Sequence, residues 1–115
     1  MCYFYVVINY ELKEYISSTG KSYFRAWFEK LGATAAAKVT AALHKMERGN
    51  FASTKFLGSG VWEFKIDTGP GYRLYFGKVG KNVVLLLAGG IKRGQNKDIQ
   101  LAVDLLDEHN KGVLH

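Results

Sequence analysis

The spacing of apolar residues changes at Gly49, and this change constrains the fold more than any other feature. Before Gly49, apolar side chains recur every three or four residues, which is the period of an amphipathic helix. Between residues 62 and 67, apolar and charged side chains alternate instead, which is the period of a half-buried strand. Two periods used in separate blocks indicate an α+β domain.

Two helices are expected before Gly49, after a first strand from Phe4 to Leu12 that is rich in β-branched and aromatic residues. Ser22 suits the N-cap of the first helix, and Gly32 suits its end. Thr34 is expected to cap the second helix, which Gly49 ends. Because only a residue or two separates the helices, we predict an antiparallel helical hairpin.

Three strands are expected next, joined by short glycine-containing turns. The first covers residues 62–67, and the Gly69-Pro70-Gly71 turn leads to the second at 72–79. The third, 83–88, is apolar on both faces and is therefore predicted to be the central strand. Gly89-Gly90 is expected to break the sheet.

A last helix is predicted from apolar residues at helical spacing between Ile99 and Leu106, with Asn96 as its N-cap. The expected order is therefore β-α-α-β-β-β-α, a mostly antiparallel sheet with an N-terminal helical hairpin and a C-terminal helix. With 115 residues and 48% hydrophobic content, we expect one domain over residues 1–115.

Several classes of protein are excluded by what the sequence lacks. Cys2 is the single cysteine, so neither an internal disulfide nor a cysteine-rich zinc site is expected. No apolar run approaches the roughly 20 residues of a membrane span, and the N-terminus lacks the basic start of a signal peptide. There is no P-loop, and the histidines lack metal-ligand spacing. We therefore expect a cytoplasmic protein without a metal or another cofactor.

Positive charge is concentrated in the middle of the chain. The net charge is +6, yet residues 38–97 contain eleven Lys or Arg and three Asp or Glu, a local balance of +8. Such a concentration is typical of a surface that binds a polyanion, although an idle basic surface would have the same composition. Glu63 and Lys65 are interpreted as a solvated strand face.

One group of these cations is expected to converge. Arg73 follows the Gly69-Pro70-Gly71 turn on the strand face away from the core, and Lys92 and Arg93 follow the adjacent strand. Lys55 lies in the loop before the sheet. Together they would offer the charge that stabilises a reacting phosphodiester, or they are surface cations that keep the protein in solution.

The order of motifs in this region resembles the RelE/ParE toxin superfamily, in particular its addiction module killer protein branch, which is HigB-like and phage-derived. The most specific segments are GPGYRLYF at 69–76 and LLLAGGIK at 85–92, followed by Gln95 and Asp98-Ile99. The resemblance covers about residues 3–108. It implies a compact RelE-like domain.

The resemblance also implies a function, that of the toxin in a type II toxin–antitoxin system. RelE-like toxins cleave mRNA in the ribosomal A site without a metal: the RNA 2′-OH attacks the neighbouring phosphate and leaves a cyclic phosphate. The implied partners are the ribosome, mRNA and a cognate antitoxin of the helix-turn-helix type.

Matched by position, four residues would form the catalytic site. Arg73 would stabilise transition-state charge, Lys55 or Lys92 would act as general base, and Gln95 would bind phosphate or orient the base. Five further cations are expected to bind RNA: Lys45, Arg48, Lys65, Arg93 and Lys97.

One departure from the family pattern keeps other functions open. RelE has a tyrosine in its last segment as proton donor, whereas this chain has Lys97-Asp98-Ile99 there. ParE-like relatives inhibit DNA gyrase and cleave no RNA, and an inactive relative would only bind its antitoxin. Fold alone does not choose among these functions.

Overall fold

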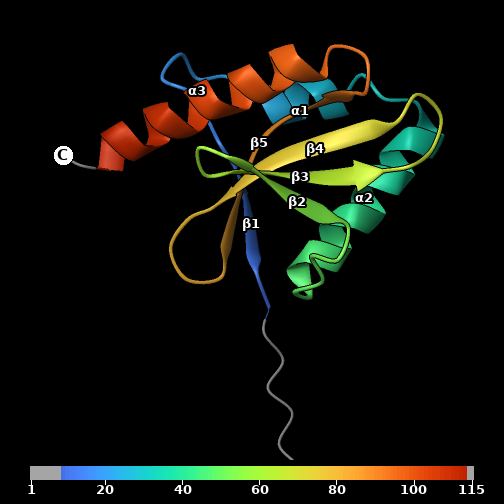
Figure 1. Cartoon of the computed structure of the whole chain (residues 1–115), viewed down its shortest axis with the longest axis horizontal. Coiled ribbons are helices and arrows are strands. Elements are labelled where there is room, and N and C mark those ends of the chain that lie inside the picture. The colour runs from blue at the N-terminus through green and yellow to red at the C-terminus, as the bar shows by residue number, and fades with distance from the viewer. Residues whose placement is uncertain (1–8, 114–115) are drawn as a thin grey trace, which may run out of the picture.

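The computed structural model describes residues 9–113, which form one five-stranded sheet and three helices (Figure 1). In chain order the elements are β1 (Glu11–Glu14), α1 (Tyr23–Phe28), α2 (Ala33–Glu47), β2 (Thr54–Gly58), β3 (Val61–Ile66), β4 (Tyr72–Lys78), β5 (Val83–Ile91) and α3 (Gln95–Val113). The predicted first strand at 4–12 falls partly outside the described residues, and β1 begins only at Glu11.

The sheet has the strand order β1-β5-β4-β3-β2. Three neighbouring pairs are antiparallel, and β1 runs parallel to β5. The predicted α+β class and the β3-β4-β5 meander are therefore confirmed. However, β5 is an inner strand rather than the middle one, because β4 holds that place.

Two strand predictions were wrong. The segment that contains Lys55 was expected to be a loop, but it forms the edge strand β2, which turns into β3 through Ser59 with a positive φ of 51°. Gly89-Gly90 does not break the sheet, since β5 continues through both glycines to Ile91. The observed order therefore has one strand more than predicted.

One of the three predicted helix N-caps is confirmed, and the other two are wrong. The Ser22 side chain accepts a hydrogen bond from the Arg25 backbone N–H at 3.1 Å, which confirms it as the N-cap of α1. Thr34 does not cap α2, because the helix already begins at Ala33 with Gly32 as its N-cap. Asn96 likewise lies inside the first turn of α3, which begins at Gln95.

Both faces of the sheet are covered by helices. On one face, α1 and α2 enclose a core that includes Phe24, Val39 and Phe76. On the other face, α3 packs against a second cluster that includes Tyr75, Leu87 and Leu106 (Figure 1). The sheet is therefore the middle layer of three, and its α3 face, where Arg73 was expected to be exposed, is partly closed.

Residues 9–113 contain neither a membrane-spanning helix nor a metal-binding cluster. None of the helices in residues 9–113 is long and apolar enough to cross a membrane. Within the same residues, no group of three or more His, Cys, Asp or Glu side chains is arranged to hold a metal ion.

Candidate phosphate-binding site on the sheet

Strand pairing aligns the candidate residues in two rows on the face that α3 covers. Residues directly opposite in antiparallel strands project on the same side of a sheet. The first row crosses β2, β3 and β4 as Lys55, Glu63 and Tyr75. The second crosses β3, β4 and β5 as Lys65, Arg73 and Gly90.

Arg73 lies at the floor of this arrangement and is only 5% exposed, so the expectation of an exposed arginine was wrong. Its Nη1 donates a hydrogen bond to the Gly71 carbonyl at 3.2 Å, and its Nε lies 3.6 Å from Glu63 Oε2. Among the described residues, the buried Nε has no hydrogen-bond partner. A guanidinium taken out of water needs a nearby anion, and Glu63 supplies it.

Glu63 is the residue that sequence reasoning missed. It is 5% exposed rather than solvated, and its Oε2 accepts a hydrogen bond from Gln95 Nε2 at 2.7 Å. Glu63 thus joins the sheet to the first residue of α3 and fixes both Gln95 and Arg73. The tight turn at 69–71 was the available signal, because pairing the strands across it places residues 63 and 65 opposite 75 and 73.

Two further groups in the cluster have raised pKa values. Burial, followed by the charges of Glu63 and Asp98, raises the pKa of Tyr75, whose hydroxyl has no hydrogen-bond partner among the described residues. Burial also raises the pKa of the Asp98 carboxyl, which packs on Gly90. A Cβ at Gly90 would lie 2.0 Å from an Asp98 carboxylate oxygen, so this contact requires glycine.

The structure brings three of the four predicted catalytic residues together. The Lys92 backbone N–H donates to the Gly71 carbonyl at 2.8 Å, the same oxygen that Arg73 contacts. Gln95 reaches the cluster through Glu63. Lys55 is on the same face but opposite Glu63, so it is two strands across and two residues along from Arg73, or about 12 Å away in the backbone.

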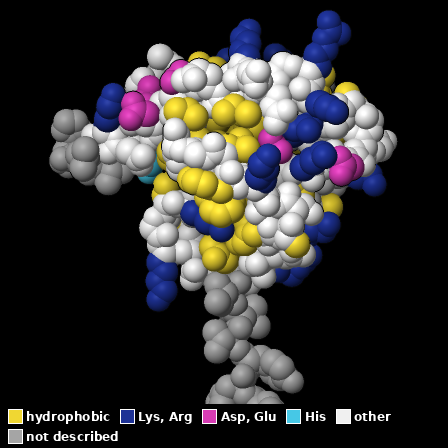
Figure 2. Space-filling model, in the orientation of Figure 1, with side chains coloured by type: hydrophobic (Ala, Val, Ile, Leu, Met, Phe, Trp, Pro, Cys, Tyr) yellow, Lys and Arg dark blue, Asp and Glu magenta, His cyan; other side chains and the backbone are white. Residues whose placement is uncertain are grey.

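The five predicted RNA-binding cations divide into two groups. Lys65, Arg93 and Lys97 are exposed close to the cluster, on strand β3 and on either side of the start of α3. Lys45 and Arg48 are exposed at the end of α2, and Lys45 lines a groove together with Lys65. Figure 2 shows Lys and Arg side chains gathered at the right of the molecule, with acidic side chains among them.

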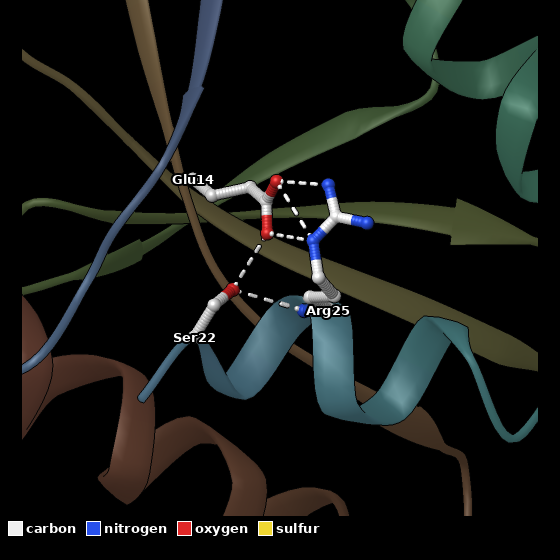
Figure 3. A network of polar contacts seen from close by, with 3 residues as sticks. All are labelled: Glu14, Ser22 and Arg25. Carbon is white, nitrogen blue, oxygen red and sulfur yellow. Dashed lines mark hydrogen bonds and ion pairs between the residues drawn. The ribbon is translucent and has the colours of Figure 1, made fainter. Parts of the chain in front are cut away.

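A separate polar network holds β1 against α1 and takes no part in the cationic cluster (Figure 3). Glu14 accepts hydrogen bonds from Arg25 Nε at 3.0 Å and from the Ser22 hydroxyl at 2.8 Å. These contacts, with that of Arg25 first, lower the pKa of the Glu14 carboxyl, although burial opposes them.

Fold and site together define a small α+β protein with a fixed arginine on one sheet face and exposed lysines around it. This arrangement suits a ligand that carries phosphate groups. The family described as phage-derived protein Gp49-like (DUF891) matches residues 26–107, and the chain belongs to that family. The matched residues include the whole Glu63–Arg73–Gln95 cluster.

One relative of known sequence is an uncharacterized protein of Haemophilus influenzae. It is 40% identical over 86 residues, which are 74% of this chain and 87% of the relative.

Proposed function

We propose that this protein is the toxin of a type II toxin–antitoxin system and cleaves mRNA on the ribosome, as RelE-like toxins do. The observation that carries the proposal is the fixed Arg73 guanidinium, held by Glu63 and the Gly71 carbonyl beside Lys92. Membership of the phage-derived Gp49-like family supports it.

The proposed reaction needs three kinds of group around one phosphate. A base removes the proton of the RNA 2′-OH, whose oxygen bonds to phosphorus while the bond from phosphorus to the 5′-oxygen breaks. Solvent water acts as the acid that protonates the departing 5′-oxygen, so that the products are a 2′,3′-cyclic phosphate and a 5′-OH. Arg73 supplies fixed positive charge beneath the phosphate, and the exposed Lys92 is the candidate base nearest to it.

The test is primer extension on cellular mRNA after induction of the protein, with and without a translation inhibitor. The parent is expected to produce in-frame cuts that disappear with the inhibitor, and Lys92→Gln is expected to lose them. Lys30→Gln removes another exposed lysine, two residues after the end of α1, and is the matched control. Intact mRNA with the parent protein, or equal cutting by Lys92→Gln, would overturn the proposal.

A second candidate function is ParE-like inhibition of DNA gyrase without RNA cleavage. It is favoured by the absence of an accessible tyrosine in this cluster, since the Tyr75 side chain is fully buried. Loss of plasmid supercoiling with intact mRNA would select it. In either case the proposed partner is an antitoxin with an acidic segment that covers the basic face.

A further inference from the structure

A groove of about 400 Å³ lies between α2 and the end of β3, on the side of the sheet opposite to the cationic cluster. On the α2 side, Lys38 and Lys45 flank a floor of alanines, and the opposite wall includes Ser53, Lys65 and Thr68. Lys38 and Lys45 are seven residues apart, so they lie on one side of α2 and about 10 Å apart along its axis. The groove therefore presents two cations in line along its α2 wall.

The positive charge in this groove is only partly neutralised. Asp67 is the acidic residue in its lining, and it pairs with Lys65 at 3.5 Å. Glu47, also on α2, pairs with His44 at 3.1 Å. In the described part of the chain, neither Lys38 nor Lys45 forms an ion pair, so both are available to an anion.

Lys65 lies at the end of β3, between the groove on one side of the sheet and the candidate catalytic cluster on the other. It lines the groove and also lies directly opposite Arg73 in the β3–β4 pairing. Its backbone N–H donates to the Ser53 carbonyl at 3.2 Å, which fixes the far wall. A polymer with regularly spaced negative charges that leaves Arg73 over the Lys65 side chain would reach Lys45 and Lys38 by turning around the end of β3.

We propose that this groove binds the phosphate backbone of the substrate RNA strand at a distance from the bond that is cleaved. This inference rests on the proposed function, because it assumes that RNA is the ligand of the Arg73 cluster. The lining suits RNA, because three of its ten residues are lysines and two carry hydroxyls, while Phe64, Ile66 and two alanines supply its apolar part.

The experiment measures binding of the full-length protein to a fluorescein-labelled single-stranded RNA with 2′-O-methyl sugars, which cannot be cleaved. Fluorescence anisotropy is followed over a series of salt concentrations for the parent, for Lys38→Gln/Lys45→Gln and for the control Lys30→Gln/Lys81→Gln. The control pair is exposed, lies outside the groove and removes the same charge.

Loss of two phosphate contacts makes the negative slope of log K against log salt shallower by about 1.4. At 0.1 M salt this change corresponds to a roughly 25-fold lower affinity. We expect this loss for the groove variant and a much smaller one for the control. Equal losses, no loss, or no RNA binding by the parent would overturn the groove proposal. So would a groove variant that keeps RNA binding but loses its antitoxin.

The two proposals fail in different measurements. The groove variant keeps the catalytic cluster, so its mRNA cuts should occur at the same positions as those of the parent, though with lower yield. If Lys92→Gln cuts as the parent does while the groove variant loses RNA binding, the assigned chemistry is wrong and the groove stands.

Discussion

Removing the charge of Glu63 should destabilise the protein strongly, because it would leave Arg73 as an unpaired buried cation. The two side chains are 7% and 6% exposed, and their atoms approach to 3.6 Å. Breaking a buried ion pair from one side costs about 3–5 kcal/mol. For a domain of this size, about 4 °C of melting temperature corresponds to each kcal/mol, so Glu63→Gln should melt roughly 12–20 °C lower.

Thermal unfolding followed by circular dichroism measures this effect, and two further variants separate its causes. In Glu63→Gln/Arg73→Gln no buried charge remains, so the double variant should melt above either single variant. Asp67→Asn breaks the exposed pair with Lys65 and should cost less than about 1 kcal/mol. A Glu63→Gln protein that melts within about 2 °C of the parent would refute the reasoning.

Two further predictions concern the packing of α3 and the attachment of α1. Gly90→Ala should cost about 1–3 kcal/mol in urea unfolding, because its Cβ would overlap the Asp98 carboxylate; unchanged stability would show that α3 does not press on β5 there. The pKa of Glu14 is lowered in the folded state, so its contribution is fully present above its usual pKa of 4.5 and is lost as the pH falls. Glu14→Gln should therefore melt below the parent at pH 7 and together with it in strong acid, whereas a constant difference would contradict the assigned contact.

The sequence predicted the β3-β4-β5 meander because alternation and a glycine-proline-glycine turn are local signals. It did not predict β2, since Lys55 and Phe56 are both exposed on this edge strand and no alternating apolar face marks it. Gly89-Gly90 resembled a strand end because neither glycine has a side chain that marks a face of the sheet. In the structure, a Cβ at Gly89 would lie 2.2 Å from the Trp27 ring, so these glycines allow α1 and α3 to approach β5 closely.

The sequence predicted some of the residues in the site, but it did not predict how deeply they are buried. The resemblance of the motifs indicated Arg73, Lys92 and Gln95, and the fold places all three around Gly71 and Glu63. The burial of Arg73 could not be predicted, because it depends on α3 crossing a strand face that also bears charged residues. The roles of the four predicted catalytic residues and of the five RNA-binding cations remain predictions.

The chemistry of the RNA ends tests the central claim most directly. A defined mRNA in a reconstituted translation reaction is incubated with the purified protein, and the ends of any fragments are analysed. The account predicts 5′-OH fragments, which an RNA ligase joins only after phosphorylation, together with upstream fragments that end in a 2′,3′-cyclic phosphate. A folded Lys92→Gln protein should yield few or none. Intact mRNA, or fragments with 5′-phosphate ends, would contradict the claim.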